Sequence, residues 1–152
     1  MRVAEVMTTG VVSVGLEASI PEIARTLTEH RISGVPVVDE AGVIVGMVSE
    51  GDLVDRIKKI HLPSMLSFLD AVIPVAGEKQ FREDLRKMAA ATAGELMTPD
   101  PVVVEDSASL EEAATLLSDH HIPLLPVVRA GELVGILGKR DVIRGMLGKD
   151  GL

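Results

Sequence analysis

The chain alternates short apolar runs with amphipathic segments. The β-branched runs at residues 11–14 and 102–104 are typical of short strands. Each run precedes a Ser-x-x-Glu sequence, at 19–22 and at 109–112, which is the capping-box pattern of a helix N-terminus. The apolar residues that follow recur at helical spacing, and they are Ile20, Ile23, Ala24 and Leu27 in the first segment and Leu110, Ala113, Ala114 and Leu117 in the second. The pattern predicts a strand and then an amphipathic helix at two places in the chain.

Two further strands are expected after each predicted helix. Apolar runs at 35–38 and 44–48 are joined by a short turn, and the runs at 125–128 and 133–137 repeat this arrangement. Such pairs of apolar runs around a short turn indicate β-hairpins. A charged amphipathic stretch follows each hairpin and predicts a last helix. The order of elements is therefore β-α-β-β-α, written twice, which predicts an α+β fold.

A proline lies in the first strand of each hairpin, at Pro36 and Pro126. Proline cannot donate a hydrogen bond to a sheet, so we expect each one at the edge or the start of its strand. A neighbouring backbone group would then stay available to a ligand. The alternative is a purely structural proline at a strand start.

The two halves are copies of one unit. An offset of ninety positions, with one residue skipped at Ala41, gives nineteen identical pairs: Glu5/Glu95, Met7/Met97, Thr8/Thr98, Val12/Val102, Val14/Val104, Ala18/Ala108, Ser19/Ser109, Glu22/Glu112, Ala24/Ala114, Leu27/Leu117, His30/His120, Ile32/Ile122, Pro36/Pro126, Val37/Val127, Val38/Val128, Gly42/Gly131, Val45/Val134, Gly46/Gly135 and Asp52/Asp141. Repeated units of this size usually cover each other's apolar faces. Any cleft between the halves should therefore have a symmetry-related counterpart.

Composition and charge narrow the classes of partner. The 152 residues, 47% of them hydrophobic, suffice for one compact core or two small ones. A formal net charge of -8 argues against general binding to nucleic acid, which needs clustered Lys and Arg. The chain has no cysteine, and it has no apolar run of the roughly 18 residues that a membrane span requires. With no signal-peptide pattern at the start, we expect a cytoplasmic protein without membrane or nucleic-acid partners.

The repeated pattern resembles the cystathionine β-synthase (CBS) domain. The resemblance rests on Met7 and Thr8, on residues 34–38 and 46–52, and on their counterparts in the second half. It implies a CBS pair, or Bateman module, with motif 1 at residues 1–60, a helical insert at 61–92 and motif 2 at 93–152. It also implies a pseudo-twofold pair with two clefts that hold adenine nucleotides or related adenosyl ligands. Homodimers of such pairs, and a sensory and non-catalytic role, are further implications.

The resemblance implies that a ribose-binding acid stands at the end of a Ser/Thr-x-x-Asp stretch. Asp52 and Asp141 occupy that position here. An ionised aspartate accepts two hydrogen bonds, which suits the vicinal hydroxyls of a ribose. Aspartate at the start of a helix is also a good N-cap, so capping is the alternative role for both residues.

The residues around the two acids differ. The first copy has a hydroxyl at Ser49 and a carboxylate at Glu50, whereas the second has no hydroxyl at Gly138 and two cations, Lys139 and Arg140. Cations beside a helix N-terminus attract anions. We therefore expect phosphate to prefer the second copy. The alternative is that the two cations are a solvated basic pair.

Two threonines, Thr8 and Thr98, precede the first strand of each copy. The resemblance implies that their hydroxyls reach the phosphate or the ribose of a ligand. By the pseudo-twofold symmetry, the threonine of one copy should serve the cleft that carries the acid of the other, so Thr8 would join Asp141.

Adenine requires a flat apolar slot, which must be aliphatic here because the two aromatic residues, Phe68 and Phe81, lie outside the repeats and the chain has no Trp or Tyr. The candidates for the slot are Val12, Val35 and Pro36 on one side and Val102, Leu125 and Pro126 on the other. The same residues are also expected in the core, so contact with a base would be a secondary role.

Catalysis and metal binding have little support in the sequence. His30 and His120 are equivalent positions near helix ends, where a cation complements the helix dipole. The chain contains no H-x-x-x-H pattern, no phosphate-binding glycine loop and no nucleophile paired with an evident base. We expect no enzyme activity, no metal site and no required cofactor beyond a regulatory nucleotide.

The insert between the repeats does not resemble a simple linker. Residues 62–75 are strongly apolar, and Phe81, Leu85, Met88 and Ala89 then recur at helical spacing. The insert either caps the core of its own pair or forms a dimer or effector contact. We expect it to help to form a homodimer and to respond to the neighbouring cleft.

The sequence therefore predicts a regulatory module that binds an adenine nucleotide of the AMP, ADP or ATP class, or another adenosyl ligand, and passes a change of shape to an unknown effector protein. The alternative is a ligand-free dimerisation scaffold of the CBS type. A weaker third hypothesis is nucleic-acid binding through a local basic patch.

Overall fold

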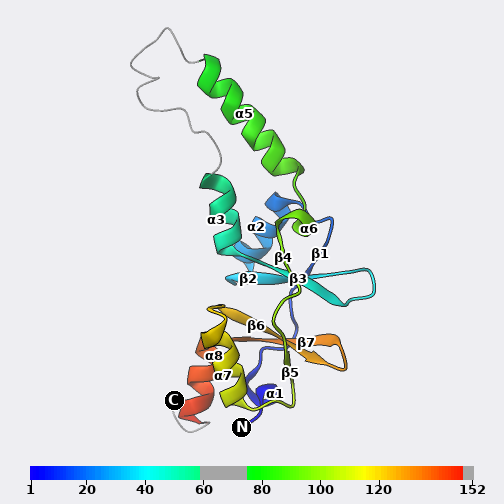
Figure 1. Ribbon diagram of the computed structural model, residues 1–152, viewed down its shortest axis with the longest axis vertical. Coiled ribbons are helices and arrows are strands. Elements are labelled where there is room, and N and C mark those ends of the chain that lie inside the picture. Colours follow the sequence, from blue (N-terminus) through cyan, green and yellow to red (C-terminus); the bar gives the residue numbers. More distant parts are fainter. Residues whose placement is uncertain (59–74, 149–152) are drawn as a thin grey trace.

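A computed structural model of the chain describes residues 1–58 and 75–148. Two layers of helix and sheet lie one above the other with their sheets facing (Figure 1). The elements of the first half are α1 (Val3–Val6), β1 (Val14–Gly15), α2 (Ile20–Glu29), β2 (Gly34–Val38), β3 (Ile44–Ser49) and α3 (Glu50–Lys58). The order β-α-β-β-α predicted for this half is confirmed.

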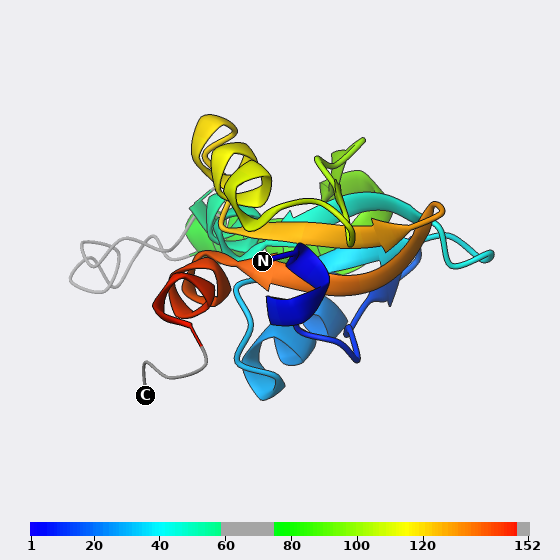
Figure 2. The same cartoon turned by 90° about the horizontal axis from the view of Figure 1, so that it is seen from below.

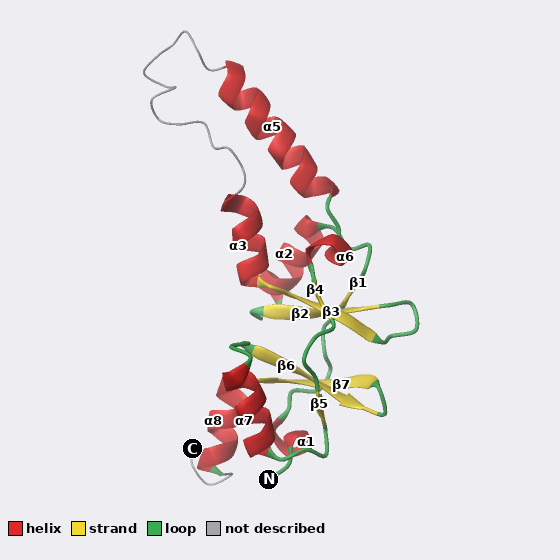
Figure 3. Ribbon diagram, viewed as in Figure 1, coloured by secondary structure: helices red, strands yellow, loops and turns green. Residues whose placement is uncertain are grey.

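The second half repeats that order after an intervening helix. Its elements are α5 (Val75–Ala90), α6 (Ala93–Leu96), β4 (Thr98–Pro99), β5 (Val104–Glu105), α7 (Leu110–Asp119), β6 (Leu124–Arg129), β7 (Glu132–Gly138) and α8 (Lys139–Leu147). Helices cover the outer face of each sheet, and the inner faces meet between the two halves (Figure 3). The predicted α+β pair is confirmed.

The two halves exchange their leading segments. The first sheet has the order β1-β2-β3-β4, so its last strand comes from the second half of the chain. In return, Thr8 of the first half pairs with Ile136 of β7, the outer strand of the β5-β6-β7 sheet. Figure 2, seen from below, shows α1 beside β7 and the β6–β7 hairpin lying over the β2–β3 hairpin. Each layer is therefore completed by residues from the other half.

The strand predicted before the helix of each repeat is shorter in the structure than the sequence predicts. In place of residues 11–14, β1 comprises Val14 and Gly15, because pairing with β2 begins where Val14 meets Val37. In the second half, β5 likewise begins at Val104.

The prolines lie inside their strands and not at the start. Pro36 is the third residue of β2, where it pairs with Met47 of β3. Because β1 pairs with β2 only from Val37 onward, β2 has a strand partner on one side alone at Pro36. This matches the edge part of the prediction. The side chains of Pro36 and Pro126 are fully buried.

The predicted helix caps form at the expected residues. The Ser19 hydroxyl accepts the Glu22 N–H at 3.2 Å, and the Glu22 carboxylate accepts the Ser19 N–H at 3.1 Å. In the second half, the Ser109 hydroxyl accepts the Glu112 N–H at 3.1 Å. These bonds satisfy backbone donors that a helix leaves unpaired at its N-terminus.

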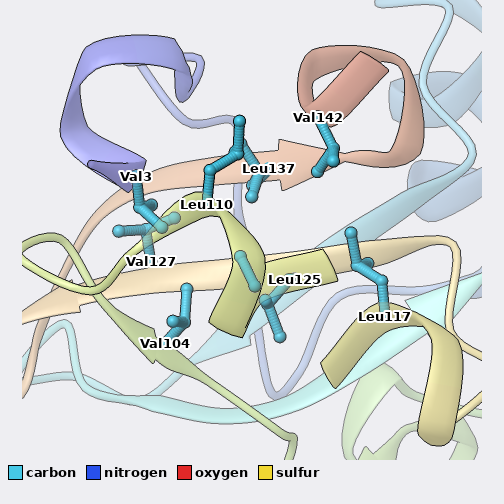
Figure 4. Packing of buried hydrophobic residues seen from close by; sticks show 9 residues of the cluster. Val3, Val104, Leu110, Leu117, Leu125, Val127, Leu137 and Val142 are labelled. Carbon is cyan, nitrogen blue, oxygen red and sulfur yellow. The ribbon is translucent and has the colours of Figure 1, made fainter. Parts of the chain in front are cut away.

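Each layer has its own hydrophobic core. The core of the second layer comprises Val3, Val104, Leu110, Ala113, Leu117, Leu125, Val127, Leu137 and Val142 (Figure 4). The core of the first layer comprises Ile23, Leu27, Val35, Val37, Val48 and Ala93. Val3 and Ala93 each lie in the core of the opposite half, since α1 and α6 are the exchanged segments.

Two identical pairs of the repeat stabilise this exchange. Met97 lies against Gly46 of β3, and Met7 lies against Gly135 of β7. A Cβ atom at either glycine would overlap the sulfur of the facing methionine. A side chain at either glycine would force the methionine to move, so glycine allows the exchanged chain to cross the strand closely.

The insert contributes α5, which contacts α2. Phe81 is half-buried and Leu85 is 38% exposed on this helix. The apolar stretch at 62–74, on which the dimer hypothesis for the insert rests, lies outside the described residues. None of the helices that the structure describes has the length and apolar character needed to cross a membrane.

Candidate functional site

A cavity of about 200 Å³ lies between the two halves. Its walls come from β2, β3 and the start of α3 in the first half, and from β4, the following loop and the start of β6 in the second. The lining residues are Gly34, Met47, Ser49, Asp52, Thr98, Asp100, Pro101, Val102, Ile122, Pro123, Leu124 and Pro126. The exchange of leading segments creates this cavity, because it places the residues after β4 opposite the acid of α3.

Asp52 is the half-buried acid of this cavity, and its carboxylate closes the turn from β3 to α3. Its Oδ2 atom accepts the Ser49 N–H at 2.8 Å and the Ser49 hydroxyl at 3.1 Å. The Asp52 N–H faces the Ser49 hydroxyl oxygen at 3.4 Å. Within the described part of the chain, the Oδ1 atom of Asp52 has no recorded hydrogen bond. Asp52 therefore caps its helix and retains one oxygen for a ligand hydroxyl.

Several of the predicted site residues meet at this cavity. Ser49, Asp52 and Thr98 border it, together with the apolar residues Val102 and Pro126. The threonine of the second half thus accompanies the acid of the first half, which is the crossed arrangement that the symmetry predicts. The role of each residue in ligand binding stays a prediction.

The remaining predicted residues lie at equivalent positions on the other side of the pseudo-twofold axis or in the cores. Thr8 is exposed and exchanges two backbone hydrogen bonds of 2.9 Å with Ile136, two residues before Gly138. Val12 is half-buried, and Pro36 is fully buried.

The environment of Asp141 differs from that of Asp52. The Gly138 N–H donates to Oδ2 of Asp141 at 2.8 Å, while Arg144 approaches Oδ1 at 3.4 Å. The Asp141 side chain is only 15% exposed. Lys139 and Arg140, in the first turn of α8, are exposed, and in the described part of the chain no hydrogen bond or ion pair is recorded for either. Asp141 thus already has a partner for each oxygen, whereas the two cations beside it are accessible.

The structure places Leu125, a candidate for the apolar slot, in the core and away from the cavity. Leu125 has no exposed area and lies in the core of the second layer. Its neighbour Leu124 lines the cavity instead, because successive side chains of a strand point to opposite faces. Val35 is likewise fully buried in the first core, and Gly34 faces the cavity.

The Leu124 side chain lies against a glycine from each of the two acid-bearing hairpins. A Cβ at Gly34 would lie 3.2 Å from one methyl group of Leu124, and a Cβ at Gly138 would lie 3.3 Å from its other methyl group. The leucine side chain therefore packs against Gly138, the residue that takes the place of Ser49 in the second copy.

Sequence reasoning missed Met47, Asp100, Pro101, Ile122, Pro123 and the pair Gly34 and Leu124 as cavity residues. A signal for some of them was present in the repeat. Gly34 aligns with Leu124 and Gly10 with Asp100, so these are positions where the two copies differ in size or charge. Identical pairs mark the shared fold, while the unequal pairs mark where the two copies can differ in chemistry.

The electrostatic character of the cavity is acidic. Among the residues that the structure describes, Asp52 and Asp100 are the charged ones that line it, and none of the lining residues is Lys, Arg or His. The part of the chain that the structure describes contains no group of three or more His, Cys, Asp or Glu able to hold a metal ion. The arrangement offers hydroxyl and carboxylate acceptors beside an apolar wall, which suits a base and a sugar.

Comparison with known proteins agrees with this arrangement. The family model described as "CBS domain" matches residues 3–59 and 93–148. The chloroplastic CBS domain-containing protein CBSX2 of Arabidopsis thaliana is 36% identical over 132 residues, which is 85% of this chain and 56% of the plant protein. The chain thus spans little more than half the length of that relative.

Solved structures have the same fold. The crystal structure of CBSX2 in complex with AMP has a TM-score of 0.72 and 32% sequence identity, and the match covers 96% of each chain. The structure of Hypoxic Response Protein I with two coordinated zinc ions has a TM-score of 0.69 and 26% identity, covering 95% of this chain and 98% of that one. With its duplicated β-α-β-β-α unit, its exchanged leading segments and the two matched regions, this chain belongs to the CBS domain family and carries a tandem pair of CBS motifs.

Proposed function

We propose that this CBS pair is a regulatory module that binds an adenine nucleotide, or another adenosyl ligand, in the cavity between its two motifs. One observation carries the proposal: the Ser49 hydroxyl, Asp52 and Thr98 meet an apolar wall in a single cavity. The free Oδ1 of Asp52 is suited to a ribose hydroxyl, and Val102 and Leu124 are suited to a base. We assign no catalytic role to these groups.

The comparisons support the class of ligand. CBSX2, which shares 32% of its residues with this chain in the superposed structures, is described in complex with AMP. The cavity of about 200 Å³ is smaller than the roughly 300–1,000 Å³ typical of ligand sites, so it accommodates part of a nucleotide and leaves the rest in solvent.

Regulation follows from the position of the cavity between two motifs. A ligand that contacts both walls stabilises one relative placement of the motifs over others, and the difference in binding free energy shifts the equilibrium between them. We propose that an effector protein responds to this shift, and that the module acts in the cytoplasm.

We also propose that the module is a homodimer formed through its outer helices. α3 and α8 carry exposed apolar side chains at equivalent positions: Val54 at 55% and Ile57 at 50%, and Ile143 at 59% and Met146 at 78%. Apolar side chains gathered in this way favour a protein contact. The double variant Ile143→Glu with Met146→Glu should lower the mass measured by light scattering to that of one chain, and an unchanged mass would reject this interface.

Isothermal titration calorimetry tests the binding proposal. Purified protein, first checked by mass spectrometry for retained nucleotide, is titrated with AMP, ADP, ATP and S-adenosylmethionine. We expect saturable binding by at least one of them in the micromolar range, and its loss in Asp52→Ala. The matched control is Asp55→Ala on the same helix, whose side chain is 68% exposed and contacts Lys58. This variant should bind like the wild type.

The alternative is that the pair serves only as a dimerisation scaffold. In that case none of the four ligands produces heat with nucleotide-free protein, while light scattering still reports a dimer. Equal losses of binding in the Asp52 and Asp55 variants would point to general destabilisation and would argue against a site at Asp52.

A further inference from the structure

The two copies differ at the residue that precedes the apolar wall of the cavity. Asp100 has a φ of 49°, in the left-handed region, and its counterpart Gly10 has a φ of 68°. Glycine adopts this conformation without steric cost, and aspartate adopts it less readily. The second half thus carries a carboxylate in a backbone conformation that favours glycine, and non-glycine residues in such conformations are concentrated at functional sites.

Asp100 also lies at the cavity. Its side chain is exposed and borders the same space as Asp52. Among the residues that the structure describes, no hydrogen bond or ion pair is recorded for Asp100. No described residue therefore neutralises the negative charge of Asp100, and this charge repels or attracts charged groups of a ligand in the cavity.

The charges around the two acids are opposite in sign. Beside Asp52, the first turn of α3 carries Glu50, and the cavity wall carries Asp100. By the pseudo-twofold symmetry, the corresponding positions at the Asp141 site are Lys139 of the second copy and Gly10 of the first. Three carboxylates therefore lie in or near the first site. The second site, in contrast, has the carboxylate of Asp141 and the two cations Lys139 and Arg140.

We propose that Asp100 is a specificity-determining residue that excludes phosphate from this cavity. The cavity then takes an adenine nucleoside whose 5′ substituent is neutral or positively charged, and phosphorylated nucleotides bind beside Lys139 and Arg140. This inference rests on the proposed function, since it assumes that the cavity holds an adenosyl group.

The size of the effect can be estimated from electrostatics. Two unit charges about 6–8 Å apart near a protein surface repel each other enough to change an equilibrium by about three- to tenfold, and salt reduces the effect. Removing the Asp100 charge should therefore strengthen phosphate binding at this cavity by that factor and leave an uncharged ligand almost unaffected.

The test is a titration of the 152-residue chain with adenosine, AMP and S-adenosylmethionine as probes, in which amide NMR signals report binding. Ser49 reports on the cavity, and Gly138 reports on the equivalent site. In the wild type, the Ser49 signal should shift at lower concentrations of adenosine and S-adenosylmethionine than of AMP, and Gly138 should respond first to AMP.

Two variants remove the charge, and each suits the backbone. Asp100→Asn keeps the size of the side chain, and Asp100→Gly installs the residue of the first copy. Both should raise AMP affinity at the Ser49 reporter about three- to tenfold while changing adenosine affinity less than twofold. The matched control, Gly10→Asp, should weaken AMP at the Gly138 reporter and leave the Ser49 reporter unchanged.

Two results would overturn the inference in different ways. The first result is that AMP and adenosine bind with equal affinity at the Ser49 reporter, and that neither Asp100 variant changes the ratio of these affinities at low or at high salt. In that case Asp100 does not exclude phosphate, but the nucleotide site at the cavity stands. If no probe shifts Ser49 in the wild type or the variants, the proposed function of the cavity fails, and the inference fails with it.

Discussion

Around Asp52 and around Asp141 the same turn from strand to helix carries different side chains. Both carboxylates accept the N–H of the residue three positions earlier at 2.8 Å, so the backbone role of the acid is the same in the two copies. Beyond that bond they differ: Asp52 also accepts a serine hydroxyl and borders a cavity, whereas Asp141 is approached by Arg144 at 3.4 Å. A duplicated fold can thus keep the capping function of a residue while its surroundings acquire a different chemistry.

The two copies also exchange side-chain volume. Gly34 pairs with Ser49 across the first hairpin, and Leu124 pairs with Gly138 across the second. In the first pair a glycine faces a serine, and in the second a leucine faces a glycine. Both pairs fit the same backbone, yet one places a hydroxyl beside its acid and the other places a glycine there.

The largest expected effect is a loss of stability that distinguishes a core residue of β6 from its neighbour at the cavity wall. Leu125→Ala should lower the free energy of unfolding by about 2–5 kcal/mol, because it removes a fully buried side chain from the second core. Leu124→Ala, one residue earlier, should destabilise less and should change ligand affinity. Urea denaturation and calorimetry on both variants check the assignment. A larger effect of the Leu124 variant on stability would contradict it.

The next effect comes from filling the space that Gly34 leaves at the first cavity. Gly34→Leu introduces a side chain into a space where even a Cβ lies 3.2 Å from Leu124. Overpacking of this kind typically costs about 1–3 kcal/mol of stability, and adenosyl ligands should no longer bind at the Ser49 reporter. Circular dichroism confirms that the variant is folded before NMR titration. Unchanged binding would show that the ligand does not occupy this cavity.

The two acids should differ in their effect on binding. Asp52→Asn weakens a charge-assisted hydrogen bond to a ribose hydroxyl, which is worth about 1.5–3 kcal/mol, or roughly ten- to a hundredfold in affinity at the cavity. Asp141→Asn should leave affinity at the Ser49 reporter unchanged. Because both residues cap a helix, both variants should lose similar stability, of about 1 kcal/mol. Equal losses of affinity at the cavity would remove the distinction between the two acids.

The smallest effect concerns the exposed cations. Replacing Lys139 and Arg140 together by alanine should weaken AMP binding at the Gly138 reporter about three- to tenfold, and the loss should shrink at high salt. The free energy of unfolding should hardly change, since both side chains are exposed. As a matched control, Lys58→Ala at the end of α3 should leave the affinity for AMP unchanged. If the double variant binds AMP normally, the two cations are only a solvated pair.

Much of the fold could be predicted from the sequence because its signals are local. The helix that Ser19 caps has its cap and its apolar stripe within about ten residues, and each hairpin has its turn between two apolar runs. The strands at 11–14 and 102–104 were predicted too long, because their length depends on where a partner strand begins. The predicted roles of residues 62–74 lie outside the described part of the chain.

The candidate site could be predicted only in outline. The repeat and the family resemblance located Ser49, Asp52 and Thr98, and the symmetry predicted that acid and threonine come from different halves. The choice between Leu124 and Leu125 could not be made, since it depends on which face of β6 meets the core.

By itself, the sequence determined a duplicated β-α-β-β-α unit, its capped helices, its hairpins and the family to which it belongs, because these depend on residues close together in the chain and on identity between its halves. Only the tertiary structure decided that Leu124 packs against both Gly34 and Gly138 and that Asp100 shares a cavity with Asp52. It also decided that Arg144 already occupies one oxygen of Asp141. These are contacts of individual side chains. Except for the contact of Arg144 with a residue three positions away, they join segments that are distant in the sequence, so they depend on packing that no local pattern encodes.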